Sequence, residues 1–66
     1  MQIVLNGKPE SIVEPMTVAE LLRGKELAPI RVAVEINEEL IPRRTFVETI
    51  LRDGDRVEIV TFVGGG

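Results

Sequence analysis

The chain contains no cysteine, so its 66 residues must fold without a disulfide framework and without a thiolate metal site. With 44% apolar residues, a chain of this length can build one hydrophobic core and has no room for a second. We therefore expect a single domain over residues 1–66, with a stability of roughly 3 to 5 kcal/mol that comes from packing alone.

Two strand-like runs at the start of the chain are separated by the dipeptide Asn6-Gly7. This dipeptide is a strong hairpin signal, because both residues tolerate the positive φ angles of a tight turn. Residues 2–5 and 8–13 are therefore predicted to pair as a β-hairpin.

A short amphipathic helix is predicted after the hairpin. Thr17 stands three residues before Glu20, which is the spacing of a capping box, and Gly24 is a plausible stop signal. Three apolar residues follow the cap at helical spacing: Val18, Leu21 and Leu22.

Two further strands are predicted in the second half of the chain. Residues 32–36 are rich in β-branched side chains, and residues 37–39 form a turn signal that ends this strand. A second turn signal at residues 53–55 precedes residues 56–63, which alternate well enough for a final strand that runs into the terminal glycines.

The stretch between these strands, residues 40–51, has a weaker pattern. Pro42 limits residues 40–41 to a short edge strand, because proline cannot donate a backbone hydrogen bond. Thr45 and Glu48 repeat the spacing of a capping box. We expect a brief strand and a helical turn capped by Thr45.

These elements predict an α+β fold in which a mixed sheet of four to five strands packs on one short helix. Strand alternation and helical spacing assign one set of side chains to the core: Ile3, Leu5, Leu21, Leu22, Val32, Val34, Ile36, Val57 and Ile59. The same alternation directs Val4, Ala33, Val60 and Phe62 to the opposite face, where an exposed apolar patch is expected.

Several classes of function are poorly supported by composition. The chain has no histidine, which removes the commonest general base and metal ligand, and its eleven acidic residues form no paired-carboxylate site. We therefore expect no catalytic residue, no metal site and no enzymatic activity. A net charge of −3 and only two aromatic residues argue against nucleic-acid binding. Residues 1–5 are too short a hydrophobic run for a signal peptide or a membrane span, so a cytoplasmic location is expected.

The residues that could take part in a reaction are the three terminal glycines, Gly64, Gly65 and Gly66. They follow directly on the hydrophobic residues of the last predicted strand. A glycine tail can lie extended in a narrow channel and present an unhindered backbone carboxylate. These are the requirements for activating a C-terminus on a partner enzyme. The alternative is that the glycines are a frayed end or a remnant of cloning.

Over nearly its whole length the chain resembles the ThiS sulfur carriers of thiamine biosynthesis, a branch of the ubiquitin-like ThiS/MoaD family. Matching features are spread along the chain, at residues 1–7, 17–22, 32–34 with Asn37, 41–43, 53–60 and 62–66. The related MoaD proteins, which are subunits of molybdopterin synthase, usually carry a Pro-Pro pair where this chain has Thr61-Phe62. This difference favours the ThiS branch.

The resemblance implies a β-grasp fold whose residues 63–66 form a flexible, extended tail. It implies that a ThiF-like E1 enzyme adenylates the Gly66 carboxylate with ATP, while the carrier itself binds no cofactor. A cysteine desulfurase or sulfurtransferase system would then supply sulfur, and a ThiG-like thiazole synthase would accept it from the thiocarboxylate. Gly64 and Gly65 would enter the active-site channel of the partner.

An exposed patch suits a carrier that passes between enzymes, and we expect Val4, Val60 and Phe62 to form the face that docks with them. Ordinary exposed apolar residues are the alternative for this patch. Three other functions remain open for the chain as a whole: a MoaD-like sulfur carrier, a non-covalent ubiquitin-like interaction module, and a modifier joined through Gly66 to lysines of other proteins.

Overall fold

The predicted hairpin is present in the computed structural model, which describes residues 1–62. Strand β1 (Gln2–Leu5) pairs in antiparallel fashion with β2 (Lys8–Ser11), and the turn residues Asn6 and Gly7 have φ angles of 48° and 83°. Strand β2 ends two residues earlier than predicted. Past the pair of Gln2 and Ser11 the Ile12 amide still donates to the Met1 carbonyl at 2.8 Å, so the hairpin bonding continues one residue beyond the strand.

The predicted helix α1 (Val18–Gly24) begins with the expected capping box. The hydroxyl of Thr17 accepts a hydrogen bond from the Glu20 amide at 3.1 Å, and the Glu20 carboxylate accepts one from the Thr17 amide at 2.8 Å. Gly24 is the last helical residue, and Lys25 is the C-cap. Both ends of the helix were thus readable from the sequence to within a residue.

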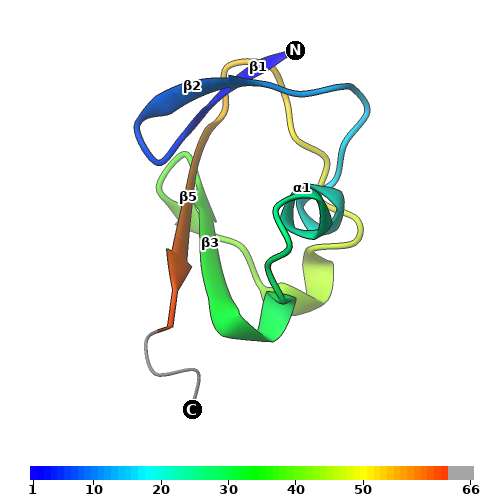
Figure 1. Cartoon of the computed structure of the whole chain (residues 1–66), viewed down its shortest axis with the longest axis vertical. Helices are drawn as coiled ribbons and strands as arrows, with labels where there is room; N and C mark the ends of the chain where they lie inside the picture. The colour runs from blue at the N-terminus through cyan, green and yellow to red at the C-terminus, as the bar shows by residue number, and fades with distance from the viewer. Residues whose placement is uncertain (63–66) are drawn as a thin grey trace.

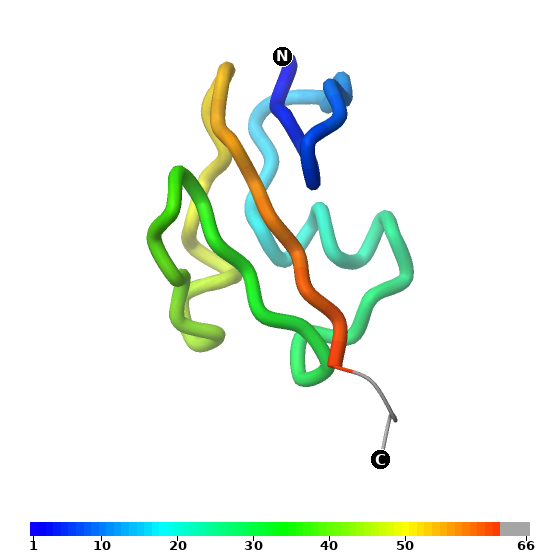
Figure 2. Tube along the Cα trace, turned by 90° about the vertical axis from the view of Figure 1, so that its left-hand side faces the viewer, coloured from blue at the N-terminus to red at the C-terminus, as the bar shows by residue number. Residues whose placement is uncertain are grey.

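The remaining strands complete a five-stranded sheet in the order β2-β1-β5-β3-β4. Strand β5 (Arg56–Thr61) lies at the centre, antiparallel to β3 (Val32–Ile36) and parallel to β1 (Figures 1 and 2). Strand β4 (Glu39–Leu40) is a two-residue edge strand. The helix packs on one face of the sheet (Figure 1). The mixed sheet and the α+β class are therefore confirmed.

Two short 3-10 helices connect these elements, η1 (Pro29–Arg31) and η2 (Arg43–Thr45). The predicted cap at Thr45 is wrong. Its hydroxyl donates to the Pro42 carbonyl at 2.8 Å, and the Glu48 amide donates to the backbone carbonyl of Thr45 at 3.0 Å. The turn η2 starts directly after Pro42 and ends at Thr45. A further turn follows, in which the Thr45 carbonyl accepts from the amides of Glu48 and Thr49, but no side-chain cap starts it. The helix η1 was not predicted.

The turn signal at residues 53–55 is confirmed. Gly54 has a φ of 87°, in the region that favours glycine, and the two flanking carboxylates accept backbone hydrogen bonds. Asp53 accepts from the amide of Gln2 and Asp55 from the amide of Arg52, both at 2.8 Å. These carboxylates therefore serve the turn.

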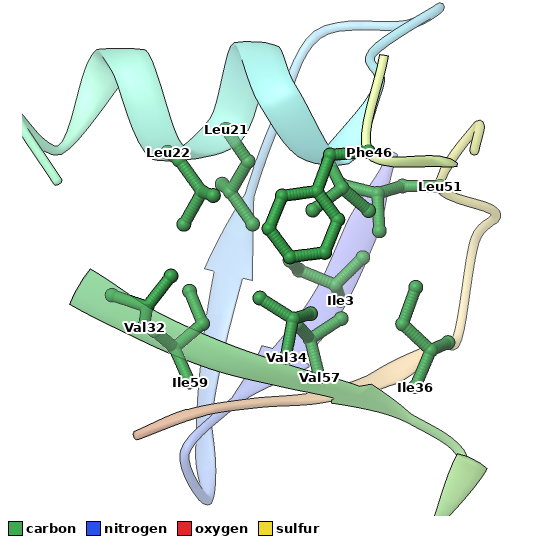
Figure 3. Packing of buried hydrophobic residues seen from close by; sticks show 11 residues of the cluster. Ile3, Leu21, Leu22, Val32, Val34, Ile36, Phe46, Leu51, Val57 and Ile59 are labelled. Atoms are coloured by element: carbon green, nitrogen blue, oxygen red, sulfur yellow. The ribbon is translucent and has the colours of Figure 1, made fainter. Parts of the chain in front are cut away.

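The core lies between α1 and the inner face of the sheet (Figure 3). All of the predicted core residues are buried except Leu5, which is half-buried because it lies at the turn end of β1 beside the exposed Asn6. The sequence analysis did not include three residues that the structure buries: Val18, Phe46 and Leu51. Phe46 lies between the helix and the sheet, where its ring faces both (Figure 3).

The N-terminus and the end of β5 lie at opposite ends of the long axis (Figure 1). Because β5 is held between β1 and β3, the fold fixes the position of Thr61 and Phe62. Residues 63–66, which include the end of the predicted strand at Val63, lie outside the described residues.

Candidate docking site at the end of β5

The candidate site is the end of β5. Thr61 lies opposite Val32 in the antiparallel register, and Val60 lies opposite Ala33. The Phe62 amide donates to the Arg31 carbonyl at 2.9 Å, so pairing with the chain leading into β3 extends one residue past the strand. Three predicted site residues, Gly64, Gly65 and Gly66, lie outside the described residues.

Phe62 lines a groove of about 240 Å³, which we call the Phe62 groove. Its lining comes from β3, β4, the segment around η2 and the end of β5. The lining residues are Val32, Ala33, Leu40, Ile41, Pro42, Arg43, Phe46 and Phe62. Seven of these eight residues are apolar, so the groove offers an apolar surface beside Phe62, the last residue that the structure describes.

Arg43 is the one charged residue of this groove. Its Nε donates to the carbonyl of Pro29 at 2.9 Å, which ties η2 to η1. The contact holds together the two segments that precede β3 and follow β4. Arg43 therefore helps to fix the wall of the groove.

The structure brings together two of the three predicted docking residues. Val60 and Phe62 are 59% and 51% exposed and alternate onto the same face of β5. Val4 is half-buried and pairs with Arg56, four residues before Val60. At about 3.3 Å per residue, Val4 lies on the order of 13 Å from Val60 along the strand, and the exposed Glu58 lies between them on the same face.

Leu40 belongs to the same surface, although the sequence analysis did not assign it there. It is 67% exposed and lies opposite Glu35 in the β3–β4 pairing. Cross-strand partners share a face, so Leu40 lies on the face that carries Ala33. The turn signal at residues 37–39 indicates that a strand could follow it. The face on which Leu40 lies, however, depends on the pairing register of the two strands, which the turn signal alone does not give.

The groove presents apolar side chains and one guanidinium group, that of Arg43. Within residues 1–62 no group of three or more acidic, histidine or cysteine side chains could hold a metal ion. Over the same residues no helix is long and apolar enough to cross a membrane. A mixed five-stranded sheet with its last strand at the centre and one helix on one face is the arrangement of a ubiquitin-like domain.

Comparison with known proteins shows to which family of ubiquitin-like proteins the chain belongs. Residues 3–66 match the ThiS family, so the chain belongs to that family. It is 44% identical over 63 residues to the sulfur carrier protein ThiS of Bacillus subtilis, with 94% of this chain and 96% of that protein covered. A crystal structure of the thiamine biosynthesis protein ThiS from Geobacter metallireducens is 40% identical, with a TM-score of 0.84 and both chains fully covered.

A third relative is a thiazole synthase of Paramagnetospirillum magneticum, which is 39% identical over all 66 residues of this chain. The chain spans only 20% of the length of that protein. The region of similarity is therefore a small part of a longer polypeptide.

The β-grasp fold and the family assignment confirm two expectations from the sequence. The function is that of a sulfur carrier in thiamine biosynthesis, and the chain is a carrier rather than a catalyst. The relatives named for thiamine biosynthesis support the ThiS branch over the MoaD alternative.

Proposed function

We propose that the group that carries sulfur is the backbone carboxylate of Gly66. Two observations support this proposal. The family match runs through the three glycines to residue 66, and Phe62, four residues before Gly66 in the sequence, lines an apolar groove. The extent of the family match is the observation that carries it.

The proposed chemistry begins with activation of a poor acyl donor. The Gly66 carboxylate attacks the α-phosphate of ATP on a ThiF-like E1 enzyme, which gives an acyl-adenylate and releases pyrophosphate. A persulfide sulfur of a cysteine desulfurase or sulfurtransferase system then attacks the acyl carbon and displaces AMP, which gives an acyl disulfide. A thiol of that system or of free cysteine attacks the distal sulfur of this disulfide, and the products are the thiocarboxylate and a new disulfide. No step requires a side chain of the carrier, which agrees with a sequence that has neither Cys nor His. ATP is a substrate of the partner, and the carrier binds no cofactor of its own.

The proposed acceptor of the sulfur is a ThiG-like thiazole synthase. The similarity of this chain to part of a thiazole synthase supports that choice, because one polypeptide there combines a carrier-like region with the remainder of the protein. Gly64 and Gly65 are proposed to lie in the active-site channel of each partner, where a residue with a Cβ would meet the channel wall.

Activation can be tested by ATP–pyrophosphate exchange on an adenylating enzyme of this type. The full chain should support exchange, and a chain that lacks Gly65 and Gly66 should not. Equal exchange with both chains would refute the role of the Gly66 carboxylate and favour a non-covalent module. Recovery of Gly66 joined to lysines of other proteins would instead support a modifier of the ubiquitin type.

We further propose that Val60 and Phe62 form the docking face, with Val4 at its far end. The structure offers a matched pair for this test, since Val60 and Val13 are both well exposed, at 59% and 73%, and only Val60 lies beside the groove. Val60→Asp should raise the KM of the carrier in adenylation, as should Phe62→Asp, whereas Val13→Asp should leave it unchanged. Equal KM values for the folded Val60 and Val13 variants would refute the docking role.

The cytoplasmic location and the extent of the domain over residues 1–66 remain predictions. Cell fractionation tests the first. Limited proteolysis followed by mass measurement of the protected fragment tests the second.

A further inference from the structure

The side chain of Asn6 takes the place of a neighbouring strand beside β5. Strand β1 pairs with β5 only as far as Leu5, which lies opposite Val57. Beyond this point the Ile59 amide donates to Oδ1 of Asn6 at 2.8 Å, and Nδ2 of Asn6 donates to the Ile59 carbonyl at 3.3 Å. A side-chain amide thus makes the two bonds that the backbone of an adjacent strand would make.

The backbone groups of successive residues in β5 point alternately to its two sides. The amide and carbonyl of Thr61 therefore point to the same side of the strand as those of Ile59. On the β3 side, the Asn37 amide donates to the Arg56 carbonyl and the Phe62 amide to the Arg31 carbonyl. Even-numbered residues of β5 therefore bond toward β3, and odd-numbered residues face the β1 side. Thr61 is exposed, and among residues 1–62 no strand lies beside it on that side. Figure 1 shows the hairpin beside only the upper part of β5.

We infer that the amide and carbonyl of Thr61 form a strand edge that pairs with an extended segment of the adenylating enzyme, with Asn6 marking where this edge begins. The inference rests on the proposed function. An exposed strand edge is a template for strand addition, in which backbone hydrogen bonds provide affinity. The Asn6 side chain shows that an amide group fits against this edge of β5 in the register immediately before Thr61.

The position of the edge favours the enzyme that handles the tail. Thr61 precedes Gly66 by five residues, which span at most about 17 Å when extended. Any segment that pairs with Thr61 must therefore lie close to the site where the carboxylate reacts. A second copy of the chain is a poorer occupant, because each copy carries a net charge of −3 and two copies repel each other.

Amide hydrogen exchange measured by NMR tests this inference on the unaltered chain. The Thr61 amide should exchange rapidly in the free carrier and about tenfold or more slowly in the complex with the adenylating enzyme. The Phe62 amide, which donates to Arg31, is the internal control and should be protected in both states.

A pair of variants gives a second, independent readout. Thr61→Pro removes the amide that faces the open side, whereas Thr61→Val keeps it and retains the branched shape of the side chain. The Kd for the adenylating enzyme should rise about tenfold for Thr61→Pro through the lost bond and the added ring, and it should stay unchanged for Thr61→Val. If the proline variant fails to fold, amide hydrogen exchange on the unaltered chain still tests the inference.

The outcomes separate this inference from the proposed function. A wild-type chain that supports ATP–pyrophosphate exchange, with a Thr61 amide that stays unprotected in the complex, would overturn the strand edge alone. A wild-type chain that neither binds nor supports exchange would overturn both. Protection of Thr61 in the free carrier, together with a dimer on size-exclusion chromatography, would assign the edge to a second copy and refute the inference.

Discussion

Replacement of Asn6 by glycine should destabilise the fold more than the same replacement at Asn37. Both asparagines have left-handed backbones, with φ of 48° and 52°, and both use their side chains to bond to β5. Glycine accepts this conformation, so the replacement removes the side-chain bonds without adding backbone strain. The added chain entropy of glycine is the same at both positions and cancels in the comparison.

The expected difference follows from burial. Asn6 bonds to both the amide and the carbonyl of Ile59 at a part-buried position, so Asn6→Gly removes two bonds where water has limited access and should lower the free energy of unfolding by about 1–3 kcal/mol. Asn37 bonds to the amide of the exposed Arg56, where water can replace the lost partner. Asn37→Gly should therefore cost about 1 kcal/mol or less.

Urea unfolding followed by far-ultraviolet circular dichroism measures both values, because the chain has no Trp or Tyr to serve as a fluorescent probe. With a total stability of roughly 3 to 5 kcal/mol, the Asn6 variant should show a clearly lower midpoint than the Asn37 variant. Equal losses at the two positions would show that the Asn6 side chain does not substitute for a strand, and would refute this reasoning.

Three further variants test other parts of the fold by the same unfolding assay. Leu22→Ala empties a fully buried position and should cost about 2–5 kcal/mol, enough to unfold much of the population at 25 °C; a loss below 1 kcal/mol would contradict the assigned core. Thr17→Ala removes the helix cap and should cost about 1 kcal/mol, and no loss would argue against the capping box. Gly54→Ala meets no atom within 4 Å of the new Cβ, so its loss of about 1 kcal/mol should come from the φ of 87° alone, and an unchanged stability would contradict that conformation.

Local patterns were sufficient for the elements whose signals do not depend on distant residues. The Asn6-Gly7 turn, the Thr17 cap and the alternation in β3 and β5 all appear where the sequence predicted them. Thr45 shows the limit of such patterns. Thr17 has an extended backbone and starts a helix, whereas Thr45 already ends the turn that follows Pro42. The spacing to the next glutamate is the same in both cases.

The burial of Phe46 and Leu51 could not be predicted, because both lie in an irregular segment without periodicity. Their positions depend on how this segment packs against α1, where Thr17 forms an isolated bridge with Ile50. The Phe62 groove was likewise beyond local reasoning. It joins Leu40 and Phe62, which are far apart in sequence and meet only through the pairing of β4, β3 and β5.

The most direct test of the central claim is the intact mass of the chain after incubation with an adenylating enzyme, ATP, a cysteine desulfurase and cysteine. The adenylating enzyme must first be shown to be active on a control carrier. The account predicts a gain equal to the replacement of one oxygen by sulfur, and a fragment spectrum that places it on Gly66. An unchanged mass would contradict sulfur transfer through the C-terminus.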